Sequence, residues 1–168
     1  MVPTIPFEKC QEGIMKSINN AQRYFGDALF LYKHGNFESS ILLSMLSYEE
    51  SGKTIMLVNY AKNEQAISKT IWRKEFCSHI KKNLACLKLI WQEVNISERF
   101  EGQQASTSKF QQDWKNVFTY VDYDFENGKW TSPLNPETFR GGKSKSFCFS
   151  ALSNAARALE VAKQKIKE

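Results

Sequence analysis

The sequence predicts an all-α protein, a bundle of four main helices with a long irregular loop before the last helix. Apolar residues recur every three or four positions over long segments, as in amphipathic helices. Turn-forming residues separate these segments, and none of the helices shows the alternation typical of a strand. With 168 residues, the chain is expected to form a single domain, residues 1–168, that is large enough to bury a hydrophobic core without disulfides.

The first two helices are expected at residues 7–33 and 37–62, on either side of a turn at Gly35-Asn36. The apolar stripe of the first helix consists of Ile14, Ile18, Ala21, Phe25, Ala28 and Tyr32. The second helix is apolar around most of its circumference, which predicts a central position in the bundle. Because the turn between them is tight, the two helices should pack antiparallel.

A third helix is expected at residues 68–95 and a last helix at residues 146–167. The third has a core stripe made of Trp72, Phe76, Ile80, Leu84, Leu87, Trp91 and Val94. The last has a seam made of Cys148, Leu152, Ala155, Leu159, Ala162 and Ile166. Between these helices we expect a polar loop at 97–108, a short helix at 110–118 and an irregular segment at 120–145, where Asn-Gly, Gly-Gly and Xaa-Pro pairs mark turns.

Positive charge is concentrated in two parts of the chain, whose formal net charge is +5. One group of basic residues lies within residues 69–88 and the other within residues 140–167. A basic surface suits nucleic acid or an acidic partner. A run of charges is also typical of a solvated helix face, so both interpretations stay open.

The cysteine pattern predicts reduced thiols, mostly in the core. The four cysteines are far apart and form no C-x-x-C pair, and with two histidines they cannot build a standard zinc site locally. There is no Glu-x-x-His pair and no Gly-rich phosphate loop, so we expect neither a metal nor a cofactor. No apolar run approaches membrane-spanning length and residues 1–7 are no signal peptide, which predicts a cytoplasmic protein without membrane contact.

Charged residues interrupt the second helix in its apolar middle. Lys53 lies four residues after Glu49 and three after Glu50, so either carboxylate can reach its ammonium on one helical face. Buried charges are costly unless they are paired. The cluster is therefore either an ion pair that fixes helix packing or part of a functional site, which Asp27 of the first helix could join.

Arg73 and His79 form the second candidate group. Histidine is suited to proton transfer near neutral pH, and arginine is suited to holding phosphate and stabilising its developing charge. Together they fit metal-independent RNA cleavage, in which the 2′-hydroxyl attacks the neighbouring phosphate. Six residues advance a helix by about 600°, so the two side chains point about 120° apart on one straight helix. They could converge only through a bend or across a two-fold interface, and the alternative is a surface arginine with a half-buried histidine.

Two further features could serve nucleic-acid binding. Lys82 lies one turn beyond His79 and should share its face, where it could hold a phosphate or simply be solvated. The aromatic residues around Tyr120 could stack on bases. They could equally cover an exposed end of the core.

Several of these residues follow one another as they do in a known family. The run Ser47–Lys53, which contains Glu-Glu-Ser-Gly-Lys, resembles an element of the AbiV-type abortive-infection proteins, a branch of the HEPN superfamily. The resemblance covers about residues 17–133. The elements that carry it are Asp27-Ala28-x-x-Leu31, Gly35, Ser47–Lys53, His79–Lys82, Tyr120–Asp122 and Trp130–Pro133.

The resemblance implies a HEPN-like helical bundle, commonly a homodimer. Many HEPN proteins are endoribonucleases whose Arg-x(4–6)-His motifs meet at the dimer interface, and Arg73 and His79, with five intervening residues, fit that range. The site would then be shared between two subunits. In many catalytic members a polar residue such as Asn, Asp or His follows the arginine, whereas this chain has Lys74.

The leading functional hypothesis is a phage-defence protein that arrests translation by cleaving tRNA, rRNA or mRNA. His79 would be the general acid/base and Arg73 would stabilise the phosphorane charge. The expected supporting residues are Asp27, Glu49, Glu50, Lys53 and Tyr120, and the expected RNA-binding residues are Lys74, Lys81 and Lys82.

Two alternatives without chemistry remain. A helical binding module would block the translation machinery or respond to a phage-encoded activator protein, and its Glu-Glu-Lys cluster would be structural. An antitoxin-like partner would instead form a stable complex with another small protein.

Overall fold

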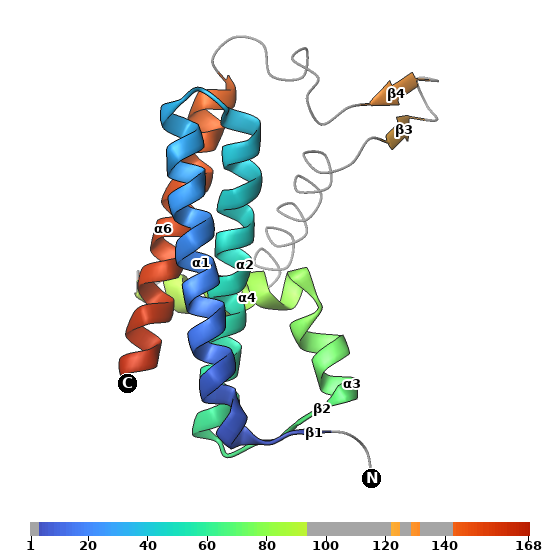
Figure 1. Cartoon of the computed structure of the whole chain (residues 1–168), viewed down its shortest axis with the longest axis vertical. Helices are drawn as coiled ribbons and strands as arrows, with labels where there is room; N and C mark the ends of the chain where they lie inside the picture. The colour runs from blue at the N-terminus through green and yellow to red at the C-terminus, as the bar shows by residue number, and fades with distance from the viewer. Residues whose placement is uncertain (1–3, 94–121, 125–128, 132–142) are drawn as a thin grey trace.

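The structure, a computed structural model, describes residues 4–93, 122–124, 129–131 and 143–168. In this part of the chain four long helices dominate, which confirms the all-α bundle: α1 (Cys10–Lys33), α2 (Phe37–Lys62), α4 (His79–Glu93) and α6 (Lys143–Lys167). Helices α1, α2 and α6 run side by side along the long axis, and α4 crosses the lower half of α2 (Figure 1). The loop expected at 97–108 and the short helix expected at 110–118 lie outside the described residues.

The α1–α2 hairpin turns at Gly35, whose φ of +78° is a left-handed conformation that glycine adopts at little cost. Two serine hydroxyls on α2 donate to carbonyl oxygens of α1, Ser40 to Ala28 at 2.6 Å and Ser47 to Ala21 at 2.8 Å. These bonds fix the register of the two helices. The antiparallel pairing predicted from the tight turn is confirmed.

Helix α2 packs against α1, α4 and α6, so the central position predicted from its all-round apolarity is confirmed. Its contact surfaces include a stripe of small hydroxyl residues that sequence analysis did not single out. The stripe is fully buried and comprises Ser40, Ser44, Ser47, Ser51 and Thr54. Small side chains allow neighbouring helices to approach closely, and their hydroxyls bond to backbone carbonyls, so no donor is left unsatisfied.

The core lies where α1, α2, α4 and α6 meet. The predicted stripe of α1 and the predicted seam of α6 both face it, with Phe25, Tyr32 and Ile166 only partly buried. Ala28 packs with Cys148 near the start of α6, and Ile166 packs near the start of α1. Helix α6 therefore runs antiparallel to α1, as Figure 1 also shows.

The single third helix expected at residues 68–95 is wrong. The structure divides it into a short helix α3 (Lys69–Ile71), a π-helical turn η2 (Trp72–Phe76) and α4, with the helix interrupted at Cys77 and Ser78. The break changes the angular phase of the residues that follow. Ile80, expected in the core stripe, is consequently 39% exposed.

Two small antiparallel sheets accompany the helices, although the sequence predicted no strands. Strand β1 (Thr4–Ile5) pairs with β2 (Ile67–Ser68), and a 3₁₀ turn, η1 (Phe7–Lys9), leads into α1. Strand β3 (Asp122–Asp124) pairs with β4 (Lys129–Thr131) within the segment expected to be irregular, which corrects that prediction. The Asn127-Gly128 pair between them is a common hairpin sequence and was the available signal.

Candidate functional site

The carboxylate of Glu49 is the centre of the candidate site. Glu49 lies in the middle of α2, and only 5% of its side chain is exposed. His79 Nδ1 lies 2.6 Å and Lys82 Nζ 3.3 Å from the same oxygen, Glu49 Oε2. Residues some thirty positions apart thus meet at one carboxylate, where α4 crosses α2.

The start of α4 places His79 and Lys82 together. Ser78 caps this helix, since its hydroxyl accepts the N–H of Lys81 at 3.3 Å and its carbonyl accepts the N–H of Lys82 at 3.2 Å. His79 and Lys82 are then three residues apart on one helical face. The prediction that they share a face is confirmed. Ser78, a favoured N-cap residue type, was a helix-start signal that the sequence analysis missed.

The geometry fixes the proton on the imidazole. An ionised carboxylate only accepts hydrogen bonds, so Nδ1 of His79 donates to Glu49. In the neutral ring the lone pair then resides on Nε2. The His79 side chain is 39% exposed, whereas that of Lys82 is 7% exposed. The imidazole is therefore the most solvent-accessible group of this cluster.

The burial of Lys82 changes its expected role. Its ammonium neutralises the buried Glu49 carboxylate, and a buried pair of this kind is stable only while both partners remain. This position argues against contact between Lys82 and an RNA backbone. It also rules out the simple solvated lysine that was the alternative interpretation.

Glu50 and Lys53 form a separate pair. Their side chains are half-buried and lie 2.5 Å apart, so the partner of Lys53 is Glu50 rather than Glu49. Both line a groove of about 490 Å³, whose α1 residues are Lys16, Ser17, Asn19, Asn20 and Arg23. The two neighbouring glutamates therefore serve different surfaces of α2, Glu49 towards α4 and Glu50 towards α1.

Asp27 does not join either pair. Its side chain is 54% exposed and lies 3.6 Å from Arg23 of its own helix. The Ser40–Ala28 hydrogen bond puts Asp27 near the level of Ser40, about two and a half helical turns from Glu49. The expectation that Asp27 could join the charged cluster of α2 is therefore not met in this structure.

Arg73 lies in the π-helical turn that precedes the break, and its side chain is exposed. Single π-helical turns are frequent at functional sites. Within the described residues no hydrogen bond or ion pair joins Arg73 to His79. The bend alone does not bring the two together in one subunit.

The remaining predicted binding residues divide into two groups. Lys74 and Lys81 are exposed, as a contact with RNA requires. Tyr120 lies outside the described residues.

Three cysteines, Cys10, Cys86 and Cys148, are buried, which confirms the prediction that the thiols lie mostly in the core, and all four are free in this structure. Cys77 is exposed at the helix break. Burial raises the pKa of the Cys86 thiol far above its ordinary value of 9.0, so Cys86 stays protonated in the core. Its Sγ donates to the Tyr48 carbonyl at 3.5 Å, where α4 packs on α2.

Two other properties bear on function. No group of three or more His, Cys, Asp or Glu side chains among the described residues could hold a metal ion. In the described part of the chain no helix combines the length and apolarity that crossing a membrane requires.

Comparison with known proteins gives one match. The family model described as AbiV, HEPN_AbiV, matches residues 9–138, which include α1, α2, α4 and the whole Glu49–His79–Lys82 cluster. No curated protein and no solved structure matches the chain significantly.

Proposed function

This chain belongs to the AbiV family of HEPN proteins, and from this membership we propose that it defends against phage by cleaving RNA and so arresting translation. Abortive-infection phage defence is the role that the family suggests. The observation that carries the proposed chemistry is the 2.6 Å contact between His79 Nδ1 and the buried Glu49 carboxylate. A buried carboxylate that fixes the tautomer of a partly exposed histidine is the arrangement that a general base requires.

In this proposal His79 moves the proton. The Nε2 atom takes the proton of a ribose 2′-hydroxyl, whose oxygen attacks the adjacent phosphorus. A P–O2′ bond forms and the P–O5′ bond breaks. The leaving 5′-oxygen receives a proton from the imidazolium of the same or a second subunit. The products are a 2′,3′-cyclic phosphate and a 5′-hydroxyl, and no metal or cofactor takes part.

Glu49 is a positioning residue in this scheme. Its carboxylate keeps Nδ1 protonated and stabilises the imidazolium that forms when Nε2 takes up a proton. Lys82 compensates the charge of the buried Glu49 carboxylate, because an unpaired buried charge is costly. Each member of the cluster thus has a separate role.

Arg73 would stabilise the charge of the pentavalent phosphorus. Since nothing joins Arg73 to His79 among the described residues, we propose that two copies of the chain form a homodimer in which the guanidinium of one approaches the imidazole of the other. Lys74 and Lys81, both exposed on the same stretch of chain, would contact phosphates beside the cleaved bond.

Incubation of purified protein with total RNA tests the proposal. The wild-type chain, with or without lysate of phage-infected cells to supply an activator, should produce discrete fragments that end in 2′,3′-cyclic phosphate. His79→Ala should produce none, whereas Lys163→Ala, a change at an exposed lysine on α6, should cleave as the wild type does. Equal fragment yields from the His79→Ala chain would exclude His79 as the catalytic residue.

The burial of Lys82 favours a second candidate, a binding module without chemistry. A Glu49–Lys82 pair that is satisfied inside the protein stabilises the packing of α2 on α4 whether or not a reaction occurs. Such a module would block the translation machinery directly or respond to a phage protein. Intact RNA together with stalled ribosomes would identify it.

A further inference from the structure

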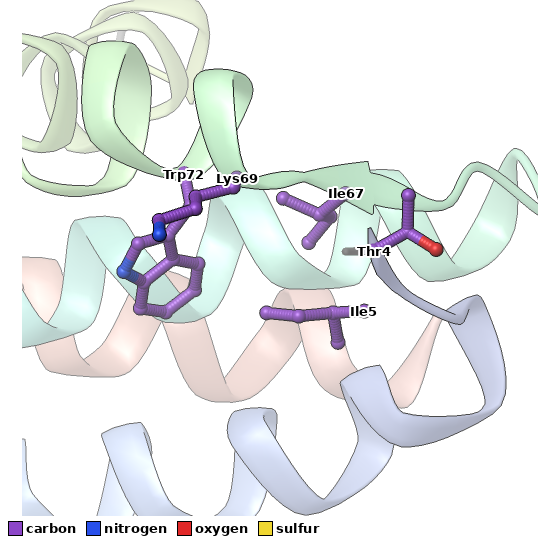
Figure 2. A pocket seen from close by; sticks show the side chains of 5 residues that line it. All are labelled: Thr4, Ile5, Ile67, Lys69 and Trp72. Carbon is purple, nitrogen blue, oxygen red and sulfur yellow. The ribbon is translucent and has the colours of Figure 1, made fainter. Parts of the chain in front are cut away.

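A small apolar pocket lies beside the π-helical turn that carries Arg73. It is lined by Thr4 and Ile5 of β1, Ile67 of β2, and Lys69 and Trp72, and its volume is about 240 Å³ (Figure 2). Sites for whole drug-sized ligands usually exceed about 300 Å³. This pocket therefore suits a single ring system rather than a complete nucleotide.

One side of the pocket is the aromatic ring of Trp72, which is packed against the core. Trp72 stacks on Phe76 with ring centroids 4.9 Å apart and planes 11° from parallel, and Phe76 is 2% exposed. The β1–β2 pairing sets Ile5 opposite Ile67, which is fully buried. A ring held against a core residue is preorganised to receive another flat group at low entropic cost.

Lys69 lies at the pocket, and a second basic residue, Arg73, lies next to Trp72 in the sequence. Lys69 lines the pocket, and no described residue forms an ion pair with it. Arg73 directly follows Trp72, so the two side chains start from Cα atoms about 3.8 Å apart. The only acid between residues 69 and 76, Glu75, accepts a hydrogen bond from Tyr60 at 3.1 Å. An apolar pocket bordered by a cation that no described residue neutralises complements a base that carries a phosphate.

We propose that this pocket is a base subsite that binds one unpaired nucleobase of single-stranded RNA, with the adjoining phosphate on Lys69. The proposal rests on the proposed function and extends it, because a base seated beside Trp72 puts the neighbouring phosphodiester next to Arg73. The protein then prefers unpaired over helical RNA, since a base inside a duplex must first unpair and unstack, at a cost in free energy, to enter the pocket.

Binding is measured on the full-length His79→Ala chain, so that the RNA stays intact. The probes are a fluorescent RNA decamer and an abasic sugar–phosphate decamer of equal charge. Ile5→Phe enlarges a half-buried side chain of β1 that points into the pocket, and Ile5→Leu is its matched control of equal size (Figure 2). Loss of one stacked base corresponds to between about 5- and 150-fold in affinity.

We expect Ile5→Phe to weaken binding of the RNA decamer within that range and to leave binding of the abasic decamer unchanged. Ile5→Leu should bind both probes as its parent does. Lys69→Ala should weaken binding of both probes. The slope of log affinity against log salt concentration should fall by about one, which corresponds to the loss of one phosphate contact. Equal RNA affinity for Ile5→Phe and Ile5→Leu would overturn the base subsite.

A second measurement uses the unaltered pocket and does not depend on the folding of a variant. RNA containing 4-thiouridine is crosslinked by light, and the tryptic peptide Thr70–Arg73, which contains Trp72, should carry the crosslink. Crosslinks confined to other peptides would contradict the proposal.

The two proposals fail in different ways. Cleavage of RNA by the wild type with no effect of Ile5→Phe on RNA binding removes the subsite alone. Base-dependent binding without any cleavage removes the proposed catalysis and keeps the subsite. Absence of RNA binding by every chain, with and without infected lysate, removes both.

Discussion

Gly52 of α2 lies directly against the backbone carbonyl of Lys82 in α4. A Cβ atom on Gly52 would stand 1.9 Å from the Lys82 oxygen and 2.6 Å from its carbonyl carbon. Both distances are far below van der Waals contact, and the obstacle is backbone rather than a flexible side chain. Only glycine therefore allows α4 to approach α2 closely enough for His79 and Lys82 to reach Glu49.

The first prediction concerns this contact. Gly52→Ala should push α4 away from α2 and lower the free energy of unfolding by about 3 kcal/mol or more. Chemical denaturation with urea measures the change. The matched control is Gly26→Ala, since Gly26 is exposed in α1 and a Cβ there would meet nothing within 4 Å. That variant should gain about 0.5–1 kcal/mol from helix propensity, and equal effects at the two glycines would contradict the close approach.

A second prediction separates the two adjacent glutamates. Glu49→Gln leaves the buried Lys82 ammonium without a charged partner and should cost about 3–5 kcal/mol of stability. Glu50→Gln disturbs only the half-buried pair with Lys53 and should cost about 1 kcal/mol or less. Thermal and urea unfolding of both variants at the same pH provide the comparison. Similar losses of stability would show that Glu49 contributes no more to the stability of the fold than Glu50 does.

A third prediction distinguishes positioning from stability. The double variant Glu49→Gln with Lys82→Met removes both buried charges and should recover most of the stability lost in Glu49→Gln alone. RNA cleavage should remain low, because His79 still lacks the carboxylate that fixes its tautomer. Cleavage that recovers together with stability would mean that Glu49 serves the fold only.

A fourth prediction follows from the buried thiol. Burial raises the pKa of Cys86 above its ordinary 9.0, so the unfolded chain loses this proton at a lower pH than the folded one. The stabilisation is complete below pH 9 and is lost as the pH rises above it, by about 1.4 kcal/mol per pH unit for one such group. Burial also raises the pKa of the Tyr48 hydroxyl well above 10.0, which adds to the loss at higher pH.

Urea unfolding between pH 7 and pH 10.5 measures this dependence. Cys86→Ala should be less stable at neutral pH but show a shallower decline above pH 9. Cys77→Ala, at the exposed thiol, should keep the wild-type decline. Parallel curves for Cys86→Ala and the wild type would contradict the assignment.

A fifth prediction uses the same thiols as probes of the core. A coloured disulfide reagent should modify Cys77 rapidly in the native protein, because it is exposed. Cys10, Cys86 and Cys148 should react only at the rate at which the chain unfolds or opens locally. Rapid reaction of two or more thiols in the native protein would show that the reagent reaches the buried cysteines without unfolding, which would contradict their burial.

The sequence predicted the helices well because their information is local. The spacing of Ile14, Ile18 and Ala21, and the turn at Gly35-Asn36, depend on neighbouring residues alone. Helix α2 spans Phe37–Lys62, the residues that were expected. The break at Cys77-Ser78 was missed because neither proline nor glycine marks it, and the capping hydroxyl of Ser78 is the sole local sign.

The site was only partly predictable because its contacts are not local. Spacing within α2 allowed Lys53 to pair with either glutamate, and only the crossing of α4 assigns Glu49 to His79 and Lys82. The same crossing explains why Lys82 is buried although lysine is usually solvated. The role of Gly52 also appears only when α2 and α4 are placed together.

Protection of cells against phage tests the central claim most directly. Wild-type and His79→Ala chains are expressed at equal levels, and the efficiency of phage plating is compared with that of cells lacking the protein. The account predicts that the wild-type chain protects strongly, so that the efficiency of phage plating is low. With His79→Ala the efficiency of plating should return to that of cells lacking the protein. The variant should fold, and melt at nearly the wild-type temperature. Undiminished protection by a well-folded His79→Ala chain would contradict the account.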